Sequence, residues 1–237
     1  YPGEILGIVG ESGSGKSMTV KAILGLLDRQ FRIEGQAWFE GKDLCRAGRD
    51  ELRRLRGQKI GMVLQNPMTC FDPLYRIGSQ MAETFAAHTD WDRAKIREIS
   101  LEVLEKMRIH NPEEVLGQYP HQLSGGMLQR VIIAMAMMLD AKFVLADEPT
   151  TALDVIHRNG IIDLFSQMKA NGVGIFMVTH DFATALQLGG NVLVMKEGKI
   201  IESGEVQSVF DHTTEPYTRS LIEAYSLSCA FTKGAES

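Results

Sequence analysis

A glycine-rich loop near the start of the sequence constrains the fold more than any other feature. The loop Gly10–Ser17 reads G-E-S-G-S-G-K-S, and it joins an apolar, strand-like run, Ile5–Val9, to a helical pattern, Met18–Leu27. Glycines let successive backbone N–H groups curl into a nest for an anion, and the following helix points its positive end at the same place. In this context the pattern predicts a phosphate-binding loop rather than a glycine-rich turn that matches by chance. We therefore expect the chain to bind a nucleoside triphosphate.

The last two residues of this loop are expected to carry the strongest contacts. Lys16 reaches the β- and γ-phosphates as a point charge, and the Ser17 hydroxyl is a ligand for Mg²⁺. The residues predicted to bind the nucleotide through this loop are Gly10, Glu11, Ser12, Gly13, Ser14, Gly15, Lys16 and Ser17.

A second strand pattern, Phe143–Ala146, ends in two consecutive carboxylates, Asp147 and Glu148. Ligands bind at the carboxyl ends of strands in open α/β sheets, so both acids are expected to face the loop. Asp147 is predicted to hold Mg²⁺, and Glu148 to act as general base on the attacking water. An isolated Asp-Glu-Pro is better explained as a solvated turn, but the phosphate loop favours an active site. A further strand pattern ends in His180, either a structural histidine or one that reaches the γ-phosphate.

Short apolar runs alternate with helical patterns along the chain. Such runs suit strands of a parallel sheet that is covered on both faces. Apolar residues at helical spacing, and a cap with first-turn Pro and acids at Asn111–Glu114, occupy the stretch from about Gly78 to Leu139. We predict an α/β fold in which a parallel sheet carries an inserted helical subdomain. The predicted strands are Ile5–Val9, Ile60–Leu64, Phe143–Ala146, Gly174–Val178 and Asn191–Met195.

Charge and cysteine content exclude several classes of protein. The 25 Lys and Arg against 30 Asp and Glu give a net charge of −5, which argues against nucleic acid as a partner. Cys45, Cys70 and Cys229 form no C-x-x-C pair, which excludes a disulfide framework or zinc knuckle and indicates a reducing cytoplasm. The longest uncharged apolar run, Val131–Leu139, is half a membrane span. The basic cluster Arg53–Lys59 is interpreted as a solvated helix face, with contact to lipid head groups as the alternative.

The segment Leu123–Arg130 points to one family. It reads L-S-G-G-M-L-Q-R and closely resembles the signature of ABC ATPases. The resemblance covers essentially the whole chain and implies a P-loop NTPase with a RecA-like core, with ATP and Mg²⁺ as cofactors. Family members stack adenine on an aromatic residue well upstream of the phosphate loop, so we expect the N-terminal strand region to be missing here. The implied plan is a single domain, 1–237, with the core at 1–65 and 141–210, the helical subdomain at 66–140 and a C-terminal tail at 211–237.

The resemblance also assigns further residues. Gln65 resembles the Q-loop glutamine, a Mg²⁺ ligand and sensor of the membrane subunits. Asp154 resembles the D-loop aspartate, and His180 the switch histidine. The start of the signature helix offers N–H groups to an anion. The family implies that this anion is the γ-phosphate held by the opposite subunit, contacted in trans by Ser124, Gly125 and Gly126.

Within this family, the chain is most similar to a stand-alone importer cassette. Repair members insert long coiled coils before the signature, translation members carry two cassettes, and exporters often carry fused membrane helices; this chain shows none of these. The implied partners are two integral membrane permease subunits, a second ABC ATPase subunit (the same chain or a related one) and, indirectly, an extracytoplasmic substrate-binding protein. The implied location is peripheral, on the cytoplasmic face of the inner membrane.

Finer features resemble the oligopeptide, dipeptide and nickel importer group. Gln65–Met68 matches that group, and Glu215–Leu221 resembles its H-P-Y-T-R segment with Glu in place of His. The residues Met127–Arg130 and the short C-terminal stretch with Cys229 look more like the nickel importer D subunit. We predict nickel, or a nickel chelate, as the cargo. Peptide import is the alternative, and a non-transport ABC ATPase of the repair or regulatory class is the third reading.

Overall fold

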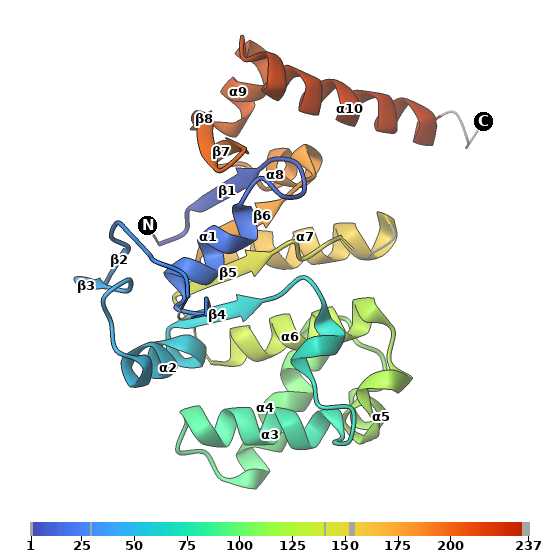
Figure 1. The fold of residues 1–237 in the computed structure, drawn as a ribbon. Coiled ribbons are helices and arrows are strands. Elements are labelled where there is room, and N and C mark those ends of the chain that lie inside the picture. The colour runs from blue at the N-terminus through green and yellow to red at the C-terminus, as the bar shows by residue number, and fades with distance from the viewer. Residues whose placement is uncertain (1, 29, 140, 152–154, 234–237) are drawn as a thin grey trace.

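The computed structural model describes residues 2–28, 30–139, 141–151 and 155–233 (Figure 1). Its centre is a six-stranded sheet in the order β4-β5-β6-β1-β7-β8. The first five strands in this order are parallel, and β8 runs antiparallel to β7. The strands of this sheet are β1 (Ile5–Val9), β4 (Ile60–Val63), β5 (Phe143–Asp147), β6 (Gly174–Thr179), β7 (Asn191–Lys196) and β8 (Lys199–Glu205).

Helices cover both faces of this sheet, and a separate helical layer lies beside β4 (Figure 1). A small antiparallel pair, β2 (Trp38–Phe39) and β3 (Lys42–Asp43), follows the first helix. The helices are α1 (Lys16–Ile23), α2 (Arg49–Gln58), α3 (Ile77–His88), α4 (Arg93–Lys106), α5 (Pro112–Gly117), α6 (Gly125–Met138), α7 (Val155–Ala170), α8 (Phe182–Leu188), α9 (Val206–His212) and α10 (Pro216–Lys233), with 3₁₀ turns η1 (Pro67–Cys70) and η2 (Pro120–Gln122).

Alternate strand residues enter two different cores, as a sheet covered on both faces requires. Leu145 and Phe176 pack with buried residues of α1 and α2 on one face. Val144 and Ile175, their neighbours in the same strands, pack on the other face with α7 and with the helices between β4 and β5. The predicted helical subdomain therefore shares one continuous core with the sheet.

Helix α6 makes the joint between this helical layer and the sheet. It contacts β4, where Gly61 faces it. A Cβ atom at Gly61 would lie 2.9 Å from the Cβ of Ala136, closer than such atoms approach, so the absent side chain lets the helix pack against the strand. Since α6 begins with the signature segment, this joint also sets where that segment lies.

Most sequence-based elements are confirmed, and three need correction. The predicted strands agree with β1, β4, β5, β6 and β7 to within one residue at each end. The helix expected over Met18–Leu27 ends at Ile23, because Gly25 takes a left-handed conformation (φ 63°). Asn111 precedes α5 but makes no side-chain cap hydrogen bond, since its own backbone is left-handed (φ 51°). The sheet is not wholly parallel, because β8 folds back beside β7.

A third cluster of buried side chains joins β7, α8, α9 and the first turns of α10, and includes Val9 of β1. The segment predicted as a C-terminal tail, 211–237, therefore begins on the core and continues as α10. Within the part of the chain that the structure describes, no helix combines the length and apolar character needed to cross a membrane.

Candidate nucleotide-binding and hydrolysis site

The loop Gly10–Ser17 connects β1 to α1 at the carboxyl edge of the parallel sheet. Gly13 and Gly15 have positive φ angles of 85° and 103°, which give the loop the curled backbone expected of an anion nest. Gly10 is needed for space, because a Cβ atom there would lie 2.1 Å from the carbonyl oxygen of Met195 in β7. The geometry of the loop thus fits phosphate binding, and β7 packs closely against the loop at Gly10.

The side chain of Lys16 folds back onto the phosphate loop. Its Nζ atom donates hydrogen bonds of 2.8 Å to the carbonyl oxygens of Gly10 and Glu11, and the side chain is 3% exposed. Burial lowers the pKa of the Lys16 ammonium, and the carboxylates of Glu148 and Asp147 act in the opposite direction. The charge of Lys16 is therefore influenced by both acids at the carboxyl end of β5.

Ser17 and Asp147 form a pair of oxygen donors. The Ser17 hydroxyl donates a 2.7 Å hydrogen bond to Oδ1 of Asp147, which is buried. Burial raises the pKa of Asp147, and the bond from Ser17 lowers it. Among the described residues, no group of three or more His, Cys, Asp or Glu side chains is arranged to hold a metal ion. The pair fits Mg²⁺, which prefers oxygen ligands and keeps phosphate and water oxygens in its shell.

Glu148 lies at the centre of a cluster of side chains. Its Oε2 atom accepts hydrogen bonds from Thr151 Oγ1 at 2.7 Å and from Gln65 Nε2 at 3.2 Å. The same oxygen lies 3.2 Å from Nδ1 of His180, whose side chain is half exposed. The backbone of Glu148 is left-handed (φ 47°), a strained conformation that is often found at functional sites. Three residues predicted from separate motifs, Gln65, Glu148 and His180, thus meet at one carboxylate oxygen.

The signature segment lies apart from this cluster. Ser124 is the N-cap of α6, where its hydroxyl accepts a 3.2 Å hydrogen bond from the Met127 amide, and Gly125 and Gly126 form the first helical turn. Among the described residues, no hydrogen bond or ion pair links Ser124–Gly126 to the phosphate loop or to Glu148. Asp154, the predicted D-loop residue, lies outside the described residues.

Two contacts to the site were missed by sequence reasoning. Thr151 donates a hydrogen bond to Glu148. The sequence could have indicated this contact, because Thr151 stands only three positions further along the same loop. Tyr217, in α10, accepts a 2.9 Å hydrogen bond from the backbone amide of Glu11 in the phosphate loop. The segment containing Tyr217 resembles a pattern of the importer group, but no local pattern indicates a contact 206 positions away.

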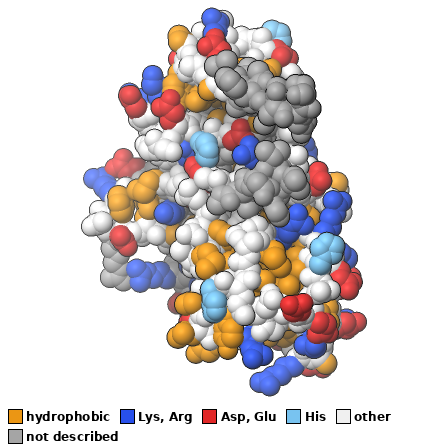
Figure 2. Space-filling view, turned by 90° about the vertical axis from the view of Figure 1, so that its right-hand side faces the viewer, with side chains coloured by type: hydrophobic (Ala, Val, Ile, Leu, Met, Phe, Trp, Pro, Cys, Tyr) orange, Lys and Arg blue, Asp and Glu red, His pale blue; other side chains and the backbone are white. Residues whose placement is uncertain are grey.

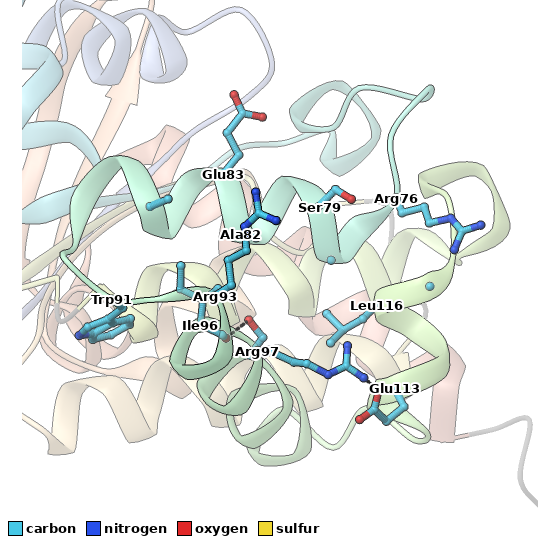
Figure 3. Close-up of a pocket in the computed structure, with 14 residues that line it drawn as sticks. Arg76, Ser79, Ala82, Glu83, Trp91, Arg93, Ile96, Arg97, Glu113 and Leu116 are labelled. Carbon is cyan, nitrogen blue, oxygen red and sulfur yellow. Dashed lines mark hydrogen bonds and ion pairs between the residues drawn. The ribbon is translucent and has the colours of Figure 1, made fainter.

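A cavity of about 740 Å³ lies elsewhere, between α3, α4 and α5 (Figure 3). Small residues of α3, such as Ala82, leave space opposite Ile96 of α4, and an ion pair between Arg97 and Glu113 lies beside the cavity. None of the predicted site residues lines it. We therefore assign the candidate site from its chemistry rather than from cavity size.

The space-filling view shows hydrophobic side chains gathered over the lower half of the face turned toward the viewer, with charged side chains of both signs around them (Figure 2). The lower half is the helical layer of Figure 1. The segment after β4 contributes exposed large hydrophobic residues, namely Met68, Leu74 and Tyr75. An apolar surface of this kind is typical of an interaction site.

Comparison with known proteins decides the family. The model of the family described as "ABC transporter" matches residues 1–151. The chain belongs to this family. It is an ABC-type ATPase, and its mostly parallel α/β fold is that of the ABC ATPase domain.

Curated relatives are named as peptide transporters. The oligopeptide transport ATP-binding protein OppD of Haemophilus influenzae is 41% identical over 94% of this chain and 69% of its own length. A putative peptide import ATP-binding protein of Brucella abortus is 42% identical over 94% of this chain and 68% of its own length.

Solved structures show the same fold. The dimeric bacterial ABC transporter cassette MJ0796 superposes with a TM-score of 0.77 at 29% identity, covering 87% of each chain. CbiO1 of Clostridium perfringens, part of an ABC transporter complex, superposes with a TM-score of 0.73 at 28% identity, covering 88% of this chain and 80% of its own.

Proposed function

We propose that this chain is the ATP-hydrolysing, energy-coupling subunit of an ABC importer for peptides. The observation that carries the proposal is the meeting of Gln65, Thr151 and His180 at the Glu148 carboxylate, beside the buried Lys16 and the Ser17–Asp147 pair. A base with its positioning groups next to a phosphate loop is what nucleotide hydrolysis requires.

In this proposal the loop binds the triphosphate of ATP. The backbone amides of Gly13–Ser17 surround the phosphates, and the Lys16 ammonium neutralises their charge. Ser17 and Asp147, with Gln65, would hold Mg²⁺. When bound, Mg²⁺ neutralises charge on the phosphate oxygens. The Lys16 ammonium has three N–H donors, and since two of them bind the carbonyls of Gly10 and Glu11, the third can donate to phosphate.

Glu148 is the proposed general base. Its carboxylate removes a proton from the attacking water, the water oxygen bonds to the γ-phosphorus, and the bond to the leaving ADP oxygen breaks. Thr151 and Gln65 hold the carboxylate in place, and His180 orients the water and the γ-phosphate. Correct orientation of base and water lowers the barrier, because the groups need no rearrangement during the reaction.

The signature segment is proposed to complete the site of a second ATPase subunit. Ser124 is exposed, and a Cβ atom at Gly125 would meet nothing within 4 Å, so the start of α6 is open to an incoming anion. ATP held by one subunit would thus join it to the signature of the other. Hydrolysis removes this contact and lets the pair open.

A groove beside Gln65 is the proposed docking place for the membrane subunit. It lies between the sheet and the helical layer, has a volume of about 390 Å³, and is lined by residues that include Leu64, Phe71 and Ile132. The segment that follows β4 adjoins this groove and exposes the side chains of Met68, Leu74 and Tyr75. Since Gln65 both adjoins this groove and contacts Glu148, docking and hydrolysis are linked by a short path. Docking would place the chain at the cytoplasmic face of the membrane.

The cargo proposed is a peptide rather than nickel. The relatives named for oligopeptide or peptide transport align with 94% of this chain at about 41% identity, as do the two cited above. The sequence features that favoured nickel are confined to Met127–Arg130 and the C-terminal stretch. No side chain of an ATPase subunit contacts the cargo in this proposal, so similarity along the whole chain is the better guide.

Uptake by cells of the source organism tests the proposal. Cells carrying Lys16→Ala should lose uptake of a labelled oligopeptide and keep uptake of labelled nickel, with Lys106→Ala, an exposed lysine of α4, as the control. Loss of nickel uptake alone would overturn the peptide assignment and restore the nickel reading. If neither uptake changed and no hydrophobic membrane subunit copurified with the chain, a non-transport ATPase would replace the importer.

A further inference from the structure

The back of the phosphate loop is held by segments from the last fifth of the chain. The carbonyl of Met195 lies against Gly10, and the Gly198 amide donates a 2.9 Å hydrogen bond to the carbonyl of Ser14. The third contact is the 2.9 Å hydrogen bond from the Glu11 amide to the hydroxyl of Tyr217. The first two come from the β7–β8 hairpin, while Tyr217 comes from α10, above the loop in Figure 1.

The side chain of Tyr217 is held on several sides. It is 8% exposed and belongs to the buried cluster that contains Phe182 and Val194. The Lys196 ammonium lies 4.9 Å from the centre of its ring, in the range of a cation–π interaction. A ring packed in this way gives its hydroxyl a defined position, so the bond to Glu11 acts as a rigid link between α10 and the loop.

This link fixes the same peptide group that anchors Lys16. The peptide between Gly10 and Glu11 donates its N–H to Tyr217 and accepts the Lys16 ammonium on its carbonyl. Tyr217 and Lys16 thus bind opposite ends of one peptide plane. Rotation of that plane would displace the anchor of Lys16, while the hydroxyl of Tyr217 opposes such rotation.

We propose that Tyr217 is a positioning residue that holds the Gly10–Glu11 peptide, and through it Lys16, in the orientation required for ATP binding. The docking of α10 and the binding of ATP are then coupled. Because such coupling is reciprocal, ATP binding stabilises the start of α10 to the same extent that a docked α10 strengthens ATP binding. The inference rests on the role proposed above for Lys16.

The variant Tyr217→Phe in the full chain tests this proposal, because it removes the hydroxyl and keeps the packed ring. Loss of this partly buried hydrogen bond should weaken ATP affinity and raise KM about 3- to 10-fold. Turnover at saturating ATP should stay within about twofold, since Glu148 and its partners are untouched. The control Ser100→Ala removes the 2.7 Å hydrogen bond that the Ser100 hydroxyl donates to the Ile96 carbonyl in α4, away from the loop, and should leave KM unchanged.

Hydrogen exchange supplies a second readout that a merely structural role would not change. Saturating ATP should slow exchange of the amides in 206–222 in the wild-type chain, and this protection should be reduced in Tyr217→Phe. Unchanged KM with unchanged protection in Tyr217→Phe, while the wild-type chain hydrolyses ATP, would overturn the role of Tyr217 and leave the proposed function intact. Equal rises in KM for Tyr217→Phe and Ser100→Ala would also overturn it, because a general loosening of the domain would then explain both. A wild-type chain unable to hydrolyse ATP would instead refute the proposed function.

Discussion

The two regions predicted to contact ATP, the loop Gly10–Ser17 and the segment Ser124–Gly126, differ in how much of their surroundings the chain itself supplies. The loop is joined by side-chain hydrogen bonds to Asp147 and Tyr217. Ser124, in contrast, is exposed and bonds within its own helix turn. A loop that already has its partners is suited to bind ATP within one subunit, whereas an exposed helix start is suited to a ligand that another molecule brings.

The strongest test of this comparison changes Glu148, the proposed general base beside the loop. Glu148→Gln keeps the size of the side chain and removes its ability to take a proton, so turnover should fall by roughly 10²–10⁴ while ATP still binds. Phosphate release and nucleotide binding measure the two effects separately. Glu223→Gln, at an exposed position of α10, serves as the control. Turnover within about threefold of the wild-type value would show that Glu148 is not the base.

A smaller effect is expected from blocking the exposed segment Ser124–Gly126. Ser124→Arg places a long cation at the start of α6, so it should block ATP-dependent dimerisation while the monomer still binds ATP. Light scattering in the Glu148→Gln background measures dimer formation without interference from hydrolysis. Ser124→Thr retains a capping hydroxyl and should still dimerise. An intact ATP-bound dimer of the Ser124→Arg variant would mean that the phosphate loop of one subunit does not meet the segment Ser124–Gly126 of the other.

The smallest expected effect concerns the packing of α6 against β4, which sets where the segment Ser124–Gly126 lies relative to the phosphate loop. Gly61→Ala introduces a methyl group 2.9 Å from Ala136 and should lower the free energy of unfolding by about 1–3 kcal/mol through overpacking. Gly117→Ala is the matched control, because a Cβ atom in that helix meets nothing within 4 Å. Urea unfolding of both variants measures the difference. Equal stabilities would indicate that α6 and β4 can move apart at little cost.

Local patterns predicted what local interactions determine. The run Ile5–Val9 is apolar throughout and forms β1 with the predicted bounds. By contrast, β8 contains Lys199, Glu202 and Glu205 and is mostly accessible to solvent, so no apolar run marks it. Its place in the sheet comes from pairing with β7 across the turn that follows Lys196. Edge strands of this kind are specified by their neighbours more than by their own composition.

The same distinction applies to the candidate site. Lys16 and Glu148 stand in motifs whose residue types already imply phosphate chemistry, whereas His180 was selected through the resemblance to a family. Their mutual geometry is not contained in the motifs. That Gln65, Thr151 and His180 share one oxygen of Glu148 depends on how β4, β5 and β6 align in the sheet. Tyr217 could not be selected, because its contact with Glu11 forms only when α10 packs above the loop.

The separation of Glu11 and Tyr217 by 206 positions has a consequence for synthesis. A ribosome delivers the phosphate loop among the first residues of this sequence, and the groups behind the loop only after β7, β8 and α9. A growing chain that has reached α8 already contains Lys16 and Glu148, yet it lacks Gly198 and Tyr217. Contacts between distant positions form late. The phosphate loop therefore gains its contacts to Gly198 and Tyr217 only after α10 has been synthesised.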